Sequence, residues 1–153
     1  MESPEVIFDR VLEITVLLQK DLARSFEGNG LTLSRTHLLW ELHRLGPSTQ
    51  QALATALEVT PRNITGLVDA LVTTGFVSRS PHPSDRRATL VTLTDLGTST
   101  MSEMTAQHQE LSQHLVAGID EDHLTHLALG LETITGRLRA LVEDAAQARQ
   151  GDA

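Results

Sequence analysis

Four of the chain's arginines stand close together, in a polar stretch whose side chains suit the binding of a polyanion. Residues 59–94 contain four arginines and two aspartates, a net charge of +2, although the chain of 153 residues carries −8 in total. The segment 1–58 has five basic and eight acidic residues, and the segment 95–153 has three basic and ten acidic residues. Salt screens charges over about 8–10 Å, so the acidic remainder does not cancel the attraction of phosphate to this stretch. The four arginines are Arg62, Arg79, Arg86 and Arg87.

The first of these arginines lies in a predicted helix that is small and polar near its start. Thr60 is a favourable N-cap and Pro61 a favourable first helical residue. A helix that enters a DNA major groove by its N-terminal end presents side chains of this kind. An arginine there can donate to guanine or phosphate, an asparagine can pair with adenine, and a glycine permits close backbone approach. The exposed face contains Arg62, Asn63, Thr65, Gly66 and Asp69, and the buried stripe contains Ile64, Leu67, Val68 and Leu71.

Another short helix precedes this one, separated from it by only Glu58 and Val59. Ser48 is predicted to begin it with a capping box, its hydroxyl accepting from the amide of Gln51. Helices joined this closely cross steeply, as in a helix-turn-helix, and Ser48, Thr49 and Thr60 then lie close to the DNA. A plain helical hairpin with a solvated face explains the two helices equally well. The predicted inner face of the first helix is Ala52, Leu53, Ala56 and Leu57.

Two predicted strands follow, around a loop that contains two of the arginines. Residues 76–79 and 90–93 have strand-like composition, and the segment 81–84 between them is rich in turn-forming residues. Two strands around a basic loop after a helix-turn-helix form a wing, whose arginines can enter a narrow minor groove. The alternative to a DNA-binding wing is an ordinary surface turn, in which an ion pair forms but makes no contact with DNA.

The second half of this wing resembles a specific family. Residues 85–94, DRRATLVTLT, match the D-x-R-x-x-x-V-x-L-T pattern of the MarR family of bacterial transcription regulators, and Gly97 follows at the family's usual place. The resemblance implies that Arg87 enters the minor groove, that Asp85 braces it, and that Arg86 lies beside it on phosphate or in the groove. Further similar residues are Leu53-Ala54, Val59-Thr60-Pro61, Leu71 and Gly75-Phe76-Val77-Ser78-Arg79.

We therefore expect a mainly α-helical fold with a small β-wing, in a single domain spanning 1–153. Residues 31–97 would form the DNA-binding winged helix-turn-helix, and 5–27 and 98–147 the dimerisation helices. Apolar residues recur every three or four positions in both terminal regions. The apolar surface of two such helices is larger than a small winged domain can cover. The alternative is that these helices pack on their own domain. The predicted homodimer contacts are Ile7, Val11, Ile14, Leu127, Leu131, Ile134, Leu138 and Leu141.

The resemblance also implies an effector, because members of the family bind small aromatic or anionic compounds beside the winged domain. His37, Trp40 and His43 are the candidate ligand contacts, although a core role explains Trp40 better than a ligand contact does. No subset of the seven histidines, His123 and His126 included, has convincing metal-ligand spacing, so we expect no bound metal or other cofactor. A zinc-responsive regulator and a winged-helix protein–protein module without DNA binding remain alternatives.

Composition excludes several other classes. The chain has no cysteine, which removes disulfides and thiolate metal sites. It has no nucleophile motif and no glycine-rich phosphate loop, so we expect no enzyme. The N-terminus lacks the order of a signal peptide, and no apolar run reaches the roughly 18 residues of a membrane span. We expect a cytoplasmic regulator, most simply a repressor of pseudo-palindromic double-stranded DNA operators.

Overall fold

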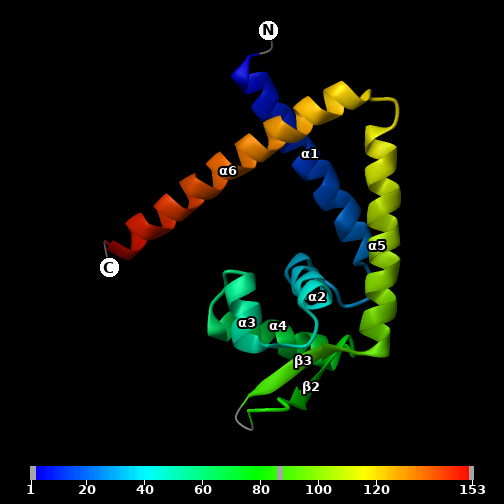
Figure 1. The fold of residues 1–153 in the computed structure, drawn as a ribbon, viewed down its shortest axis with the longest axis vertical. Coiled ribbons are helices and arrows are strands. Elements are labelled where there is room, and N and C mark those ends of the chain that lie inside the picture. The colour runs from blue at the N-terminus through cyan, green and yellow to red at the C-terminus, as the bar shows by residue number, and fades with distance from the viewer. Residues whose placement is uncertain (1–2, 86–87, 152–153) are drawn as a thin grey trace. The chain divides into compact units, whose positions relative to one another are not determined.

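Helices make up most of the chain, and a small sheet lies in its middle (Figure 1). The structure is a computed structural model that describes residues 3–85 and 88–151. The predicted fold class, mainly α with a small β-wing, is confirmed. The helices of the described ranges are α1 Pro4–Ser25, α2 Leu33–Leu45, α3 Gln50–Ala56, α4 Pro61–Thr73, α5 Asp95–Val116 and α6 Glu121–Gly151, and the strands are β1 Ser48–Thr49, β2 Val77–Pro81 and β3 Thr89–Leu93.

The chain divides into two compact units, Met1–Thr105 and Ala106–Ala153. The first unit contains α1 to α4, the sheet and the beginning of α5, and the second contains the rest of α5 with α6. The helix-turn-helix and the wing therefore belong to one unit. The predicted single domain, 1–153, and its division into a DNA-binding part and a dimerisation part stay predictions.

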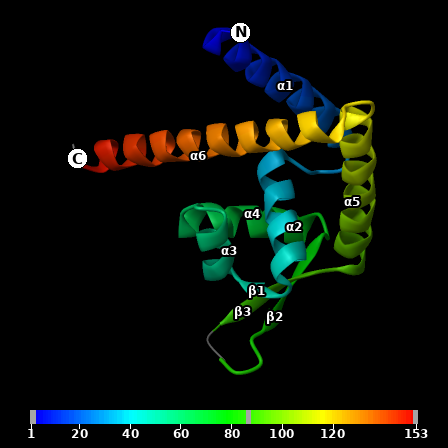
Figure 2. The same ribbon diagram turned by 45° about the horizontal axis from the view of Figure 1, so that its top comes forward.

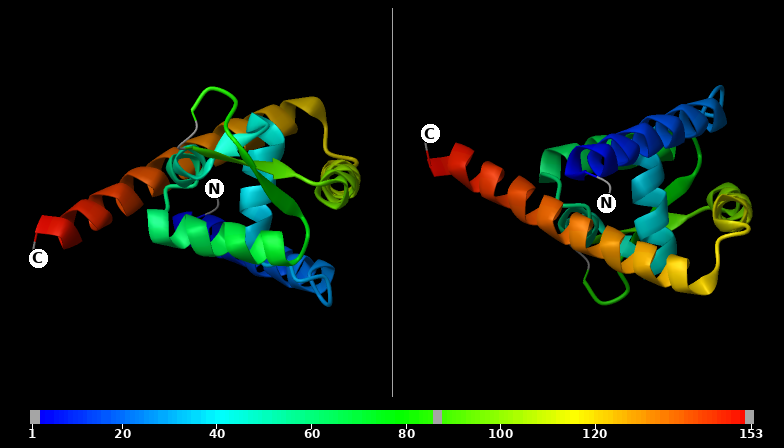
Figure 3. Two further views of the ribbon diagram at one scale, coloured as in Figure 1. Left: turned by 90° about the horizontal axis from the view of Figure 1, so that it is seen from below. Right: turned by 90° about the horizontal axis from the view of Figure 1, so that it is seen from above.

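The sheet has three antiparallel strands in the order β1-β3-β2. β2 and β3 form the predicted hairpin, with Val77 opposite Leu93 and Pro81 opposite Thr89, and the hairpin projects from the helices (Figure 3). Helix α2 contacts β3 and helix α4 contacts β2, so the sheet holds the helices in place (Figure 2). The strand β1 was not predicted.

The predicted capping box at Ser48 is wrong. Ser48 pairs with Val91 in the sheet, and its hydroxyl donates to the carbonyl of Gly46 at 2.9 Å. Thr49 caps α3 instead, its hydroxyl accepting from the amide of Ala52 at 3.2 Å. Strand pairing with a segment more than forty residues away keeps Ser48 extended, and a local capping pattern contains no information about that pairing.

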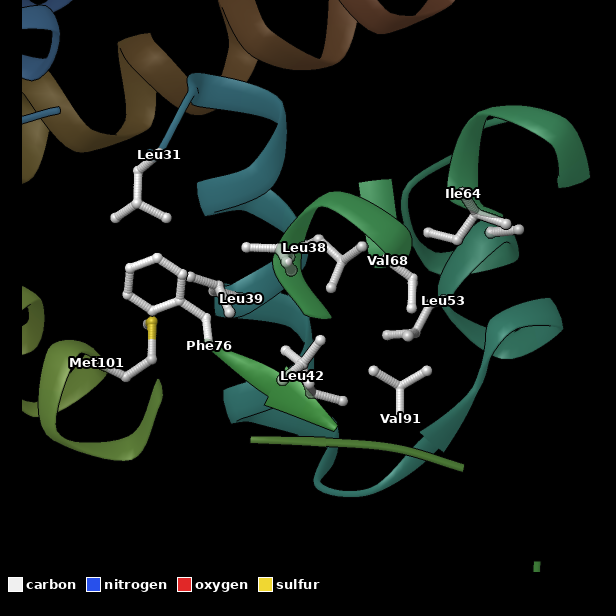
Figure 4. Close-up of a cluster of buried hydrophobic side chains, with 13 residues drawn as sticks. Leu31, Leu38, Leu39, Leu42, Leu53, Ile64, Val68, Phe76, Val91 and Met101 are labelled. Carbon is white, nitrogen blue, oxygen red and sulfur yellow. The ribbon is translucent and has the colours of Figure 1, made fainter. Parts of the chain in front are cut away.

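The core lies between α2, α3, α4 and the sheet, and α5 contributes Met101 to it (Figure 4). The predicted inner face of α3 is partly wrong, because Leu53 and Ala54 are buried whereas Ala52 and Ala56 are exposed. Leu57 is half-buried and packs against the core, as predicted, so the buried side of α3 is formed by Leu53, Ala54 and Leu57. The stripe of α4 is as predicted, with Leu67 half-buried. The core residues labelled in Figure 4 are Leu31, Leu38, Leu39, Leu42, Leu53, Ile64, Val68, Phe76, Val91 and Met101.

The start of α5 is held tightly against the beginning of β2. Thr94 caps α5: its hydroxyl accepts from the amide of Gly97 at 3.1 Å and donates to the carbonyl of Gly75 at 2.6 Å. A Cβ on Gly97 would lie 2.1 Å from the carbonyl oxygen of Phe76. Only glycine fits there without a shift of backbone, which explains this residue of the family pattern physically.

Many apolar side chains of α1 and α6 are exposed to solvent. α1 has no buried residue, and the apolar residues of α6 from Leu127 onward are exposed as well. None of the helices in the described ranges is both long and apolar enough to cross a membrane. Of the predicted dimer contacts, Val11 is half-buried and the others are exposed: Ile7, Ile14, Leu127, Leu131, Ile134, Leu138 and Leu141.

Candidate nucleic-acid interface

A sharp turn joins α3 to α4. The amide of Val59 donates to the carbonyl of Ala54 at 3.0 Å, and Glu58 adopts the left-handed conformation with φ +53°. Thr60 is the N-cap, its hydroxyl accepting from the amide of Asn63 at 3.2 Å, and Pro61 is the first helical residue. The start of α4 is therefore as predicted, and the short turn gives the two helices the arrangement of a helix-turn-helix.

The exposed face of α4 contains polar groups that nothing else in the described chain binds. Arg62, Asn63, Thr65 and Gly66 are all exposed. The side chains of Arg62 and Asn63 have no hydrogen-bond or ion-pair partner among the described residues. A Cβ on Gly66 would meet no atom within 4 Å, so another molecule's backbone could approach the helix there. Donors with unsatisfied hydrogen-bonding capacity beside a bare glycine form a surface ready for an external partner.

Thr65 connects this face to α3. Its hydroxyl lies 2.9 Å from the carbonyl of Pro61 and 3.1 Å from the side-chain oxygen of Gln50. Sequence reasoning did not single out Gln50, because the contact links residues fifteen positions apart on two helices. The only available signal was a glutamine near the start of the preceding helix. Gln50 is half-buried and restrains the position of Thr65.

The side chain of Arg79 forms an ion pair with an aspartate on the exposed face of α4. Its Nη2 atom lies 2.5 Å from Oδ1 of Asp69, with 32% of the Arg79 side chain and 58% of the Asp69 side chain exposed. Arg62, Thr65 and Asp69 recur at intervals of three and four, so they share one face of α4. The ion pair neutralises the carboxylate on that face.

His82 organises the described part of the wing loop. The amides of Ser84 and Asp85 both donate to its Nδ1 at 3.2 Å, and its own amide donates to the carbonyl of Ala88 at 3.0 Å. Asp85 is exposed. Arg86 and Arg87, the two predicted wing contacts, lie outside the described residues, so their roles stay predictions.

Three further predicted contacts have structural partners. Ser48 is 9% exposed and pairs in the sheet, and Thr49 is half-buried and caps α3. Thr60 is exposed, but its hydroxyl accepts the capping hydrogen bond of α4. These three side chains position the helices, whichever other contacts they make.

The candidate effector residues lie on α2. His37 and His43 are exposed, whereas Trp40 is half-buried and packs against the core. The rings of Trp40 and His43 meet edge to face, with centroids 6.3 Å apart and planes at 82°. Trp40 thus has the core role that the sequence left open beside a ligand role.

Histidines and carboxylates near the start of α6 bind one another locally. The backbone amide of His123 donates to Asp120, and the His123 ring lies 2.5 Å from the same carboxylate; both contacts lower the pKa of Asp120. His126 Nδ1 lies 2.6 Å from the carbonyl of Asp122. Within residues 3–85 and 88–151, no three histidine or carboxylate side chains gather as a metal site would require.

Taken together, a steeply joined helix pair, an open polar face on its second helix and a projecting two-stranded hairpin define a winged helix-turn-helix, a class of DNA-binding fold. Residues 31–89 match the model of the MarR family. The chain belongs to the MarR family and is a DNA-binding transcription regulator.

Relatives and solved structures agree with this assignment. The chain is 32% identical to the HTH-type transcriptional repressor YetL of Bacillus subtilis over 107 residues, which are 67% of this chain and 62% of YetL. RV1404 of Mycobacterium tuberculosis is 28% identical, with a TM-score of 0.72 over 89% of this chain and 94% of that one. FabT of Streptococcus pneumoniae, solved in complex with DNA, shares the fold: its TM-score is 0.76 at 19% identity, over 90% of this chain and 95% of FabT.

Proposed function

We propose that the chain is a cytoplasmic homodimer that binds pseudo-palindromic operators and represses transcription until a small ligand binds to it. The observation that carries DNA binding is the exposed face of α4, where the side chains of Arg62 and Asn63, which have no partner among the described residues, lie close to the bare backbone of Gly66. We call α4 the recognition helix. Repression is supported by the relative YetL, which is described as a transcriptional repressor.

In this proposal the recognition helix enters the major groove by its N-terminal end. Arg62 donates to guanine or to a phosphate, and Asn63 pairs with adenine. Thr65, restrained by Gln50, lies beside them on the same face. The positive N-terminal end of the helix adds attraction for phosphate.

The wing supplies the second contact. β2 and β3 hold the two described ends of its loop in register at Pro81 and Thr89. By resemblance to the family, Arg87 enters the minor groove beside Asp85, and Arg86 binds phosphate or the groove. Arg79, on β2 at the base of the wing, contributes a further phosphate contact when its ion pair with Asp69 opens.

Dimerisation would cover the apolar residues of α1 and α6. Ile, Leu and Val side chains are exposed along both of these long helices. Together they expose a larger apolar area than a soluble monomer usually does. An isologous dimer would present two recognition helices to half-sites about 34 Å apart. The proposed effector is a small aromatic or anionic compound near His37, Trp40 and His43. A coupling of about 1–3 kcal/mol would lower DNA affinity about 5–150-fold.

Fluorescence anisotropy with the DNA that flanks the protein's own gene tests the proposal. We expect sequence-selective binding that weakens steeply as salt rises, because phosphate contacts release counterions. Sedimentation should give the mass of a dimer at the same concentration. No binding at low salt would favour the protein–protein module instead. Binding that disappears when a chelator is added would favour the zinc-responsive regulator.

A further inference from the structure

A groove lies between α3 and the start of α4, on the helix-turn-helix itself. Its volume is about 640 Å³, which is within the range of small-molecule sites. Residues of both helices and of the turn line it, Gln50 and Thr65 among them. All of these residues belong to one compact unit. None of the residues that line the groove belongs to α2, so the groove is separate from the effector region that we propose around that helix.

The floor of the groove is apolar. Ala54, Val59, Pro61 and Ile64 line it, and Ala54 and Ile64 also belong to the buried core, at 7% and 2% exposed. A floor continuous with the core is rigid, because its side chains are packed on their far side. Such a floor suits a flat hydrocarbon body, whose burial supplies binding free energy in proportion to its area.

Charge at the rim selects the kind of ligand. Among the described residues that line the groove, Glu58 is the only ionisable one. Its side chain has no hydrogen-bond or ion-pair partner in the described part of the chain. The amide side chains of Gln50 and Gln51 and the hydroxyl of Thr55 complete a rim that offers oxygen acceptors and N–H donors but no cation. The full negative charge of the Glu58 carboxylate attracts an ammonium group more strongly than the partial positive charge at the N-terminal end of α4 repels it.

We propose that this groove binds a small organic cation with a flat apolar body. The ammonium group donates to the carboxylate of Glu58 and the oxygen of a neighbouring glutamine, and the apolar body lies on the floor. A cation differs from the aromatic or anionic effector that we propose for the α2 region, so the two proposed sites have different preferences.

The ligand and DNA compete, and this consequence rests on the proposed role of the recognition helix. Thr65 lines the groove and also lies on the face of α4 that we propose to meet the bases. A ligand between α3 and α4 occupies space that DNA needs in order to approach Thr65. By thermodynamic reciprocity, DNA weakens ligand binding by the same factor.

Binding to the full chain without DNA tests the site directly. The probes are 2-naphthylmethylamine and its anionic counterpart 2-naphthoate, followed by calorimetry and by the amide resonances of Gln51, Thr55 and Glu58. We expect saturable binding of the amine, with shifts at these amides, and binding of the carboxylate weaker by about tenfold or more. Equal affinity for the two probes, or no shift at these three amides, would overturn the proposal.

A matched pair of variants isolates the carboxylate. Glu58→Gln should weaken amine binding about tenfold, whereas Glu110→Gln, at an exposed carboxylate of α5, should leave it unchanged. If Glu58→Gln does not fold, Glu58→Asp and Glu58→Asn replace it, since both residues tolerate a positive φ. Charge-independent binding in either pair contradicts the proposal.

Competition is then measured with an operator fragment. The amine should raise the apparent dissociation constant for DNA in proportion to its own occupancy of the groove. If the protein binds the amine but has no affinity for DNA, the proposed function is wrong and the proposed ligand site still stands. DNA binding that is unaffected by saturating amine would overturn the competition.

Discussion

Arg79 Nη2 lies 2.5 Å from Asp69 Oδ1, which joins the root of the wing to the recognition helix. The two residues come from β2 and α4, elements that also contact each other through their backbones. The pair places a cation over the one carboxylate that shares the face of Arg62 and Thr65. It therefore influences the charge that DNA meets more than the stability of the fold, because exposed ion pairs contribute only about 0–1 kcal/mol.

Replacing Asp69 tests this interpretation. Asp69→Asn should change the free energy of unfolding by less than about 1 kcal/mol. It should raise DNA affinity at low salt and steepen the salt dependence, because a negative charge is removed and Arg79 becomes free to bind phosphate. Denaturant titration and anisotropy measure the two effects. Unchanged DNA binding in Asp69→Asn, together with weakened binding in Arg79→Ala, would mean that Arg79 contacts DNA and that Asp69 does not restrain it.

Arg62→Ala should reduce sequence discrimination. If the guanidinium makes a bidentate contact with guanine, the variant loses about 1–3 kcal/mol at one base pair and binds other sequences nearly as before. Competition among operators with single base-pair changes measures this. Arg139→Ala, which removes an exposed arginine of α6, is the matched control and should retain full discrimination. Loss of affinity without loss of discrimination would make Arg62 a phosphate contact only.

Arg87→Ala should weaken binding to all sequences to a similar degree. A contact in the minor groove or on phosphate releases about one counterion, so the slope of log affinity against log salt should become shallower by about 0.9. Anisotropy at a series of salt concentrations measures the slope. Identical slopes for the variant and the wild type would exclude the wing arginine from the mechanism.

Gly97→Ala should destabilise the fold, because the new Cβ would lie 2.1 Å from the carbonyl oxygen of Phe76. Relief of this overlap requires a backbone shift, at a cost of about 1–3 kcal/mol. Thermal unfolding should show the loss. Gly136→Ala, in α6, is the control: its Cβ meets nothing within 4 Å, and a helical alanine should stabilise by about 0.5–1 kcal/mol. Equal effects at the two positions would refute the packing explanation.

Thr36→Val should stabilise the protein. Thr36 is 3% exposed, and its hydroxyl has no hydrogen-bond partner among the described residues. Valine has nearly the same shape and removes the unpaired hydroxyl, which should raise the free energy of unfolding by about 1 kcal/mol. Thr36→Ser keeps the hydroxyl and removes the methyl group, so it should destabilise by about 0.8 kcal/mol. A destabilised Thr36→Val would indicate that the hydroxyl is hydrogen-bonded in solution.

Local patterns predicted the elements whose causes are local. Thr60 and Pro61 begin α4 as expected, because capping and the fixed φ of proline act within one helical turn. The start of α3 was misplaced at Ser48, because pairing with Val91 decides the conformation there. A residue that pairs across forty positions has no signature in its own neighbourhood.

The sequence by itself determined the family, the helix-turn-helix and the wing, since these follow from apolar periodicity, turn residues and a motif of ten consecutive positions. Only the tertiary structure decided which polar groups remain available. It bound Arg79 to Asp69 and Thr65 to Gln50, and it placed Glu58 at the rim of a groove. It left the side chains of Arg62 and Asn63 without partners within residues 3–85 and 88–151. Hydrogen bonds and ion pairs depend on distances of a few ångströms between separate elements, and periodicity along the chain does not encode those distances.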